Sequence, residues 1–242
     1  MKNQSTKTIV ILLAAISAAF YALQLILFHD WKDTAFYMLQ DWAFLPIQIA
    51  LVTVIVGRIM NEREKQARLD KTRILTSTFF SDMGTSLLDA LVPHMKNREE
   101  TASHLLSMDQ WKGADFEAAA ETVRNTSIQM DLSAQDMINI RDLLNEKRMT
   151  LLVIASNPSL LEHEDFTDML WAIFHLNDEL VYRGQIDELP QTDLIHLNVD
   201  AERVLREILV NWLCHLKFLH QEYPYLYQLE VHRNPFQAVQ AQ

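Results

Sequence analysis

Two long apolar runs near the start of the chain constrain its structure more than any other feature. The first covers residues 8–28 and the second covers residues 42–60, and no charged side chain interrupts either run before Arg58. A helix rises about 1.5 Å per residue, so each run is long enough to cross the roughly 30 Å hydrocarbon core of a bilayer. The sequence therefore predicts a two-helix transmembrane hairpin within residues 1–60.

The charges that flank the hairpin predict its orientation. Lys2 and Lys7 precede the first run, and the connection at residues 29–41 carries three aspartates against one lysine. Six basic residues follow: Arg58, Arg63, Lys65, Arg68, Lys71 and Arg73. Because lysine and arginine favour the cytoplasmic side, we expect a multi-pass inner-membrane protein with both termini in the cytoplasm. The same six side chains are the expected contacts with anionic membrane lipid.

A cleaved signal peptide is the alternative interpretation of the first run. Residues 17–19, Ser-Ala-Ala, resemble the small residues of a cleavage site. However, the apolar run continues well beyond Ala19, and a second run of similar length follows it. These two observations favour a retained hairpin.

Composition favours helices and argues against several classes of protein. The chain has four glycines, where an average chain of this length has about seventeen, and it lacks the glycine-rich loops that hold nucleotide phosphates. One cysteine, Cys214, rules out an intrachain disulfide and a cysteine zinc cluster. From residue 74 onward, 26 acidic residues face 12 basic ones, so we expect no nucleic-acid partner.

The remainder of the chain is predicted to be an all-α domain, a cytoplasmic helical bundle. We expect a juxtamembrane stalk helix over residues 61–96 and the bundle over residues 97–242. Apolar spacing predicts helices over 99–111, 115–130, 133–155, 165–182 and 191–220. Ser133 and Asp136 form a capping-box pattern at the start of one of them. The proline-pinned aromatic segment from Tyr223 to Phe236 is interpreted as an extended tail that lies over the bundle.

Several stretches of the sequence resemble a family of uncharacterised prokaryotic two-span membrane proteins. The resemblance is carried by Leu160–Leu176, by Tyr223-Pro-Tyr-Leu226 with Asn234-Pro-Phe236, and by segments 31–34 and 43–48. It extends over most of the chain and implies the membrane topology described above. No activity is known for that family, so the resemblance transfers no functional residue.

Polar residues within the hairpin leave an ion pathway open as an alternative function. Asp41, Gln48, Gln24 and Thr53 would have to face a pore that several chains build together. The preferred interpretation places Asp41 at the membrane interface, where it caps or precedes a helix that Pro46 kinks in its first turns. A stripe of small residues, Ala14, Ala18 and Ala22, can pack on the second span or on another chain.

Histidine–carboxylate pairs are the main metal candidates in the bundle. His175 with Glu179, and His196 with Asp200, lie four residues apart and so share a helix face. The complete ligand motifs of di-iron bundles and zinc proteases are missing from the sequence. The acidic run at residues 162–165 is interpreted as complementing a helix dipole, with a divalent-cation site as its alternative. We therefore expect no metal and no cofactor.

A polar stripe follows the last long predicted helix: His196, Asp200, Arg203, Glu207, Asn211 and His215. It is interpreted as a solvent-facing surface stabilised by pairs such as Asp200 with Arg203, and a binding cleft is the alternative. Cys214 follows Trp212 and Leu213, which are residues of the buried type, so we expect it in the core without a catalytic role.

The sequence therefore predicts a non-enzymatic membrane protein. Its cytoplasmic domain is expected to act through contacts with protein partners, as a scaffold or a regulatory module, and to form a homo-oligomer. The alternatives are an oligomeric ion pathway and, third, a metal-dependent enzyme.

Overall fold

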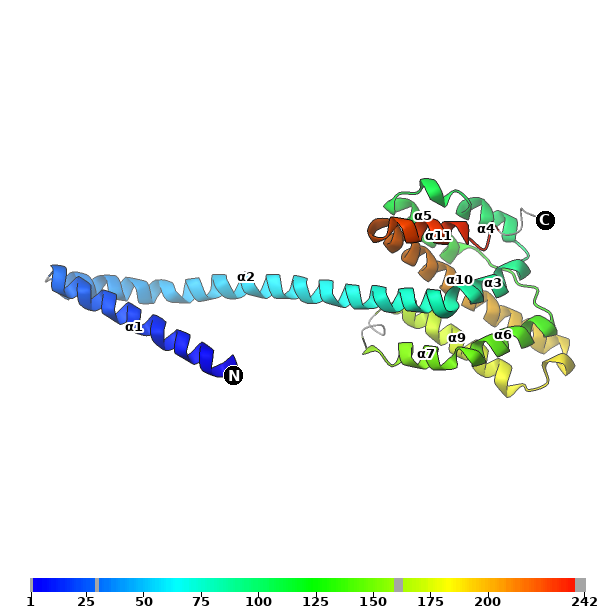
Figure 1. Ribbon diagram of the computed structural model, residues 1–242, viewed down its shortest axis with the longest axis horizontal. Coiled ribbons are helices and arrows are strands. Elements are labelled where there is room, and N and C mark those ends of the chain that lie inside the picture. Colours follow the sequence, from blue (N-terminus) through cyan, green and yellow to red (C-terminus); the bar gives the residue numbers. More distant parts are fainter. Residues whose placement is uncertain (1, 29–30, 159–162, 238–242) are drawn as a thin grey trace. The chain divides into compact units, whose positions relative to one another are not determined.

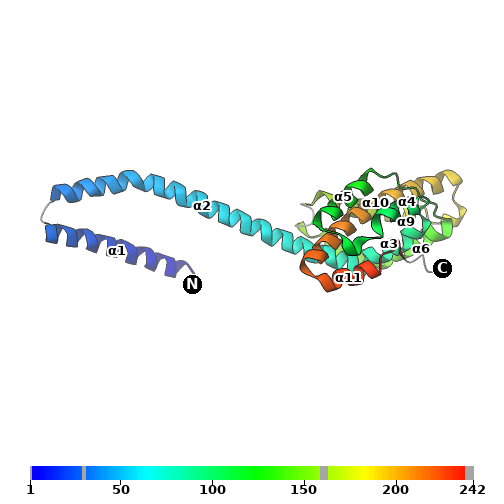
Figure 2. The same cartoon turned by 90° about the horizontal axis from the view of Figure 1, so that it is seen from above.

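All regular elements in the described part of the chain are helices. The computed structural model describes residues 2–28, 31–158 and 163–237, and it divides the chain into two compact units, residues 1–65 and 66–242. Figures 1 and 2 trace these helices in two perpendicular views. The prediction of an all-α fold, with an apolar N-terminal part and a helical bundle, is confirmed.

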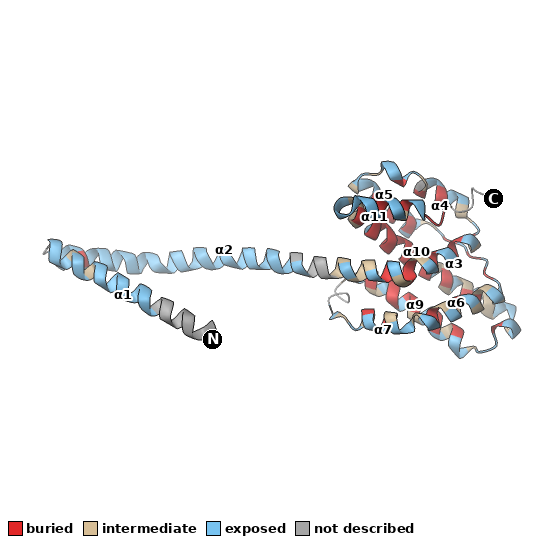
Figure 3. Ribbon diagram, in the orientation of Figure 1, coloured by how far each residue is buried: buried red, intermediate tan, exposed pale blue. Residues whose placement is uncertain are grey.

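The first unit contains α1 (Lys2–Phe28) and the beginning of α2 (Trp31–Phe79). Within the stretch Trp31–Lys65 of α2, the most apolar 18-residue window has a mean hydropathy of 2.0, and none of that window is buried. Among the described residues, this helix alone is long and apolar enough to cross a membrane, and Ile11–Leu27 forms a shorter apolar helix. Figure 3 colours the described part of α1 and the N-terminal part of α2 almost entirely as exposed.

The start of α2 differs from the sequence prediction. The helix begins at Trp31, so Asp41 lies in its third turn and does not cap or precede it. Pro46 is likewise inside the helix and not in its first turns. Residues 31–41 contain no glycine or proline, and Asp33 lies in the first turn, where an acid complements the helix dipole. These local preferences extend the helix eleven residues earlier than the apolar run itself indicates.

The end of α2 enters the core of the second unit. A π-helix, η1 (Phe80–Gly84), follows α2 and leads into α3 (Thr85–Leu91) and the short turn η2 (Val92–His94). The segment expected as a stalk, 61–96, therefore contributes side chains to the core from Phe79 onward. A Cβ atom on Gly84 would lie 2.6 Å from Cδ1 of Phe80 and 2.8 Å from Cε1 of Phe79, so the π-helix requires glycine at this position.

The second unit is built round its longest helix, α10 (Gln191–Glu222). This helix packs against α9 (Glu164–Tyr182) and against α5 (Gly113–Asn125), and Figure 1 shows it between these two partners. Its buried face carries mainly leucine, isoleucine and valine. Burial of such side chains at about 1.5–3 kcal/mol each is the main force that assembles the bundle.

Smaller helices complete the two sides of α10. One side has α4 (Arg98–Leu105), η3 (Met108–Gln110) and α11 (Pro224–His232), and the other has α6 (Ala134–Glu146), α7 (Arg148–Ala155) and η4 (Ile186–Glu188). Figure 1 shows α5 and α11 together on one side of α10, and α6 and α7 with α9 on the other.

The predicted ends of α9 and α10 are confirmed to within two residues, whereas the helices predicted over 99–111 and 115–130 end earlier, at Leu105 and Asn125. The amide of Asp136 donates to Oγ of Ser133 at 3.3 Å, and the amide of Ser133 donates to Oδ2 of Asp136 at 2.9 Å, as a capping box requires. Gly184 ends α9 with a left-handed φ of +66°. The predicted helix over 133–155 is divided, because Lys147 ends α6 and precedes α7.

The C-terminal segment is a helix, and the prediction of an extended tail is wrong. Pro224 occupies the first turn of α11, where its missing N–H and fixed φ are compatible with a helix. Asn234 then fixes the end of the segment, because its Nδ2 donates to the carbonyl oxygen of Leu105 at 2.8 Å and its Oδ1 accepts from the amide of Phe236 at 3.0 Å. Arg98 adds a bond from Nη2 to the carbonyl oxygen of Pro235 at 2.9 Å.

Candidate functional site

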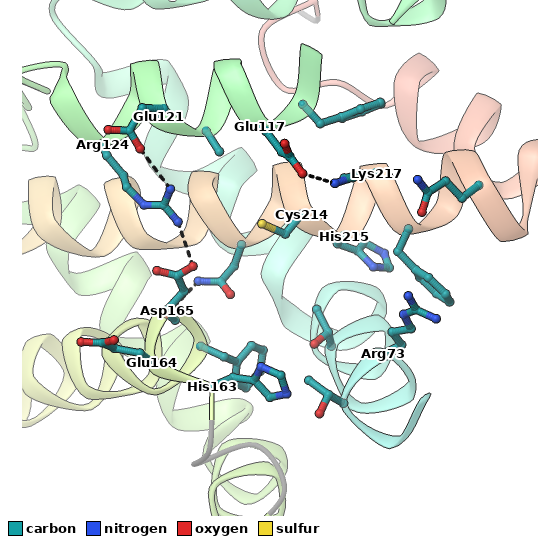
Figure 4. A pocket seen from close by; sticks show the side chains of 18 residues that line it. Arg73, Glu117, Glu121, Arg124, His163, Glu164, Asp165, Cys214, His215 and Lys217 are labelled. Carbon is teal, nitrogen blue, oxygen red and sulfur yellow. Dashed lines mark hydrogen bonds and ion pairs between the residues drawn. The ribbon is translucent and has the colours of Figure 1, made fainter. Parts of the chain in front are cut away.

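The second unit contains a cavity of about 820 Å³ between four helices. Its walls come from α2, α5, α10 and the beginning of α9, and Figure 4 shows the side chains that face it. Ligand pockets of proteins have volumes of about 300–1,000 Å³, so the cavity has the size of a small-molecule site. Its polar and charged lining residues are Thr72, Arg73, Thr76, Glu117, Glu121, Arg124, His163, Glu164, Asp165, Asn211, Cys214, His215, Lys217 and Gln221.

Ion pairs connect the helices at the edge of the cavity. Arg124 on α5 contacts Oδ2 of Asp165 on α9 at 2.8 Å, and it also contacts Glu121 at 3.4 Å. Lys217 on α10 pairs with Glu117 on α5 and lowers the pKa of the Glu117 carboxyl. Figure 4 shows both connections as dashed lines. The pairs hold α5 beside α9 and α10, although their exposure limits their contribution to stability.

Asn211 joins α10 to the beginning of α9 beneath this edge. Its Nδ2 donates to the carbonyl oxygen of Asp165 at 2.9 Å and to that of Glu207 at 2.9 Å. Asn211 is buried, so these bonds satisfy an amide that would otherwise be costly. Burial also raises the pKa of the neighbouring Glu207 carboxyl, and the charge of Asp168 adds to that shift.

Two adjacent residues of α10, Cys214 and His215, line the cavity but differ in their exposure to solvent. His215 is buried, stacks on Phe80 with ring centroids 5.1 Å apart, and has a pKa lowered by burial to about 4. Its Nδ1 has no hydrogen-bond partner among the described residues. Cys214 is exposed, which corrects the prediction of a core position, yet the surrounding protein removes enough water to raise the pKa of its thiol. Both side chains are therefore neutral near pH 7.

The six basic residues expected at the membrane surface have different environments. Arg58, Arg63 and Lys65 are exposed, and the side chains of two others, Arg68 and Lys71, lie outside the described residues. Arg73 lines the cavity, with its Cζ 5.0 Å from the ring centroid of Phe218. Such a cation–π contact shows that Arg73 belongs to the bundle.

The polar stripe of α10 is not one uniform surface. His196 and Arg203 are exposed, but Asn211 and His215 are buried and line the cavity, which supports the cleft interpretation for the C-terminal part of the stripe. Asp200 contacts His175 and His196 instead of the expected Arg203. Tertiary contacts with α9 and α5 cover one end of the stripe, and the sequence spacing did not reveal this.

Two of the candidates for an ion pathway, Asp41 and Gln24, lie close together in the first unit. Tyr21 donates a hydrogen bond from its hydroxyl to Oδ2 of Asp41 at 2.8 Å, and both line a shallow hollow together with Gln24. Gln48 is exposed and is not among the residues that line this hollow. The stripe formed by Ala14, Ala18 and Ala22 is exposed and is not covered by α2.

Metal candidates are not assembled as finished sites. Among the described residues, no three histidine, cysteine or acidic side chains already surround a common point as metal ligands. Within the acidic run at 162–165, Glu162 lies outside the described residues, and Asp165 is paired with Arg124. Some cavity residues could not be found from the sequence. Glu117 and Lys217, for example, form an ion pair although they are 100 positions apart, and no local pattern connects them.

Fold and cavity together define a helical protein with an apolar N-terminal unit and a C-terminal bundle. Residues 68–232 match a family model described as the C-terminal helical domain of uncharacterized protein MJ1433, and residues 1–60 match the model of its N-terminal helical domain. The chain therefore belongs to the MJ1433 family. It is similar to uncharacterized protein MJ1433 of Methanocaldococcus jannaschii, with 34% identity over 228 residues that cover 94% of this chain and 92% of the relative. No solved structure matches the chain.

Proposed function

We propose that this chain is an integral membrane protein in which residues 1–60 form a two-helix anchor. The observation that carries the proposal is the exposure of a long apolar surface on α1 and α2. Within Trp31–Lys65, the most apolar 18-residue window has a mean hydropathy of 2.0, and none of it is buried. Exposure of such a surface to water is energetically unfavourable, whereas lipid acyl chains would cover it. The basic residues that follow the apolar part of α2 favour cytoplasmic termini.

In this proposal the helical domain acts through contacts with proteins and not as a catalyst. The raised pKa of the Cys214 thiol and the lowered pKa of His215 make these two cavity residues a poor nucleophile and a poor base at neutral pH. On the surface, α11 exposes an apolar face that includes Tyr225 and Leu229, with exposed fractions of 85% and 59%. Exposed apolar surface of this kind is typical of interaction sites.

A homo-oligomer is the proposed assembly, with the exposed stripe at Ala14, Ala18 and Ala22 as its contact between anchors. Small residues four positions apart allow two membrane helices to approach closely. Light scattering of the detergent-solubilised chain measures the oligomer directly. Ala18→Leu should weaken it, whereas Ala19→Leu on another face of α1 should not, and a strict monomer would contradict this part of the proposal.

Anchoring and orientation are tested separately from assembly. The full chain should remain with the membrane fraction after alkaline washing, and a chain released to the supernatant would refute the anchor. In a Cys214→Ser background, Lys32→Cys should react with a membrane-impermeant maleimide in intact cells. Asn3→Cys should react only after the membrane is broken, and the reverse pattern would invert the topology.

A second candidate function, an oligomeric ion pathway, is favoured by the position of Asp41. This carboxylate lies inside α2, accepts a hydrogen bond from Tyr21 and shares a hollow with Gln24. Ionisable groups within a membrane helix are expensive and are typical of ion or proton paths. Planar-bilayer recordings of the purified chain should then show a conductance that Asp41→Asn reduces, and silent bilayers would exclude it.

A further inference from the structure

The fold brings together two histidine–carboxylate pairs from different helices. His175 on α9 contacts Asp200 on α10, and farther along, Arg183 on α9 contacts Asp193 on α10. The later residue of α9 thus meets the earlier residue of α10, so the helices run antiparallel. The two pairs are His175 with Glu179 on α9 and His196 with Asp200 on α10. On antiparallel helices, His175 lies across from Asp200, and Glu179 lies across from His196, so the four residues form the corners of a square.

Asp200 contacts both histidines, and its hydrogen bonding is incomplete. Its side chain is 12% exposed, and its Oδ2 has no hydrogen-bond partner among the described residues. The nearest cationic or potentially cationic groups are two imidazoles, with Nε2 of His175 3.5 Å from Oδ1 and Nε2 of His196 3.4 Å from Oδ2. A neighbouring cation stabilises a largely buried carboxylate.

We propose that His175, His196 and Asp200 bind a divalent transition-metal ion of the zinc type between α9 and α10. Imidazole nitrogens and a carboxylate oxygen are ligands that Zn²⁺ prefers. Two ligand atoms bound tetrahedrally at 2.0–2.1 Å are roughly 3.3–3.4 Å apart, which is close to the two observed N···O distances. These distances are too long for good hydrogen bonds.

Metal binding requires only a small rearrangement of side chains. Each imidazole now contacts a different oxygen of Asp200, so the three ligands do not yet share one centre. Both imidazoles are about half exposed, at 51% and 54%, which gives them room to turn and gives an ion access from solvent. Asp200 is held by its depth in the helix interface and provides the fixed ligand.

Glu179 is the neighbouring carboxylate of the site and occupies the remaining corner. It lies one turn after His175, and both hydrogen bonds from Arg183, at 2.7 Å and 3.0 Å, reach its Oε2. Arg183 is held in turn by Asp193 at 2.8 Å. This network orients Glu179 beside the two imidazoles, where it can bind the ion as a fourth ligand or hold a bound water.

The test is zinc binding by the full-length chain in a non-chelating detergent, without a polyhistidine tag, in competition with a chromophoric chelator. We expect one Zn²⁺ per chain, with affinity reduced at least tenfold in His175→Ala and in His196→Ala. His232→Ala removes an exposed histidine on α11 and should leave the affinity unchanged. Co²⁺ in place of Zn²⁺ should give an absorption spectrum of nitrogen and oxygen donors that the two ligand variants lose.

Two outcomes would overturn the proposal. One is the absence of saturable binding at equimolar metal. The other is an equal affinity in the unchanged chain and in the His175→Ala/His196→Ala double variant, which would show that ions bind elsewhere. The helical circular-dichroism signal of each metal-free variant checks its folding, and Asp200→Asn, which keeps the shape of the side chain, provides a further variant that should lose the metal.

Discussion

Tyr21 of α1 and Asp41 of α2 are joined by a hydrogen bond of 2.8 Å from the phenol hydroxyl to Oδ2 of the carboxylate. The two residues are 20 positions apart and come from the two apolar helices of the first unit. The bond therefore defines which faces of the helices meet. It also gives Asp41 a partner inside an apolar helix, where an isolated carboxylate would be costly.

Removal of this hydroxyl should loosen the helical hairpin. We expect Tyr21→Phe to lower the thermal stability of the detergent-solubilised chain, because polar bonds between membrane helices contribute to their association. Asp41→Asn keeps an oxygen acceptor and should have a smaller effect. Tyr37→Phe is the matched control, since it removes an exposed hydroxyl from α2, and equal melting temperatures for all variants would contradict the prediction.

Gly84 should not tolerate a methyl group. The added Cβ of Gly84→Ala would lie 2.6 Å from Phe80 and 2.8 Å from Phe79, and both rings are buried and unable to move aside freely. Overpacking of this kind costs about 1–3 kcal/mol, so we expect a clear loss of stability in urea unfolding of the bundle. Gly57→Ala, with no atom within 4 Å of the new Cβ, is the control and should be neutral or slightly stabilising.

Asn234 should be important for the attachment of the C-terminal segment. Asn234→Ala would leave the carbonyl of Leu105 and the amide of Phe236 without their side-chain partners in a buried place. We expect a loss of about 2 kcal/mol in the free energy of unfolding. Limited proteolysis should then cleave after α11 sooner than in the unchanged chain. Gln237→Ala, near the surface of the same segment, is the comparison variant, and identical cleavage rates would argue against the proposed attachment.

The buried His215 should make the bundle less stable in acid. Its pKa is about 4 in the folded chain against 6.5 for the free side chain, so the unfolded chain binds the proton more readily. The contribution of His215 to the free energy of unfolding is complete above pH 6.5 and declines as the pH falls. Below pH 4 it is smaller by about 3 kcal/mol. Glu207, with its raised pKa, acts in the opposite sense. The measurement is therefore the difference in pH dependence between the unchanged chain and His215→Gln, and parallel curves would refute the assignment.

Cys214 should react slowly with alkylating reagents although it is exposed. Burial of its surroundings is the main cause of its raised thiol pKa, so less thiolate is present at pH 8 than in a free cysteine. We expect the rate of reaction with iodoacetamide to increase with pH beyond pH 9, the ordinary pKa of the thiol. The same chain in denaturant provides the reference rate, and a folded chain that reacts as fast as the unfolded one would disprove the shift.

Local sequence signals predicted the long helices but not the structure of the C-terminal segment. The capping box at Ser133 and the 3.6-residue periodicity before Gly184 correctly predicted where helices begin and end. The segment after Tyr223 was predicted as extended, since two prolines suggest breaks. Proline at the first turn of a helix costs little, however, and burial against the bundle then favours the helix α11.

By itself the sequence determined the helical class of this protein, its apolar N-terminal unit and its acidic bundle, because composition and periodicity act within a few turns of a helix. Tertiary structure alone decided that α5, α9 and α10 enclose a cavity, that Cys214 faces it, and that His175 meets Asp200. Contacts between residues far apart along the chain depend on which helix faces are buried together, and no local pattern records that choice.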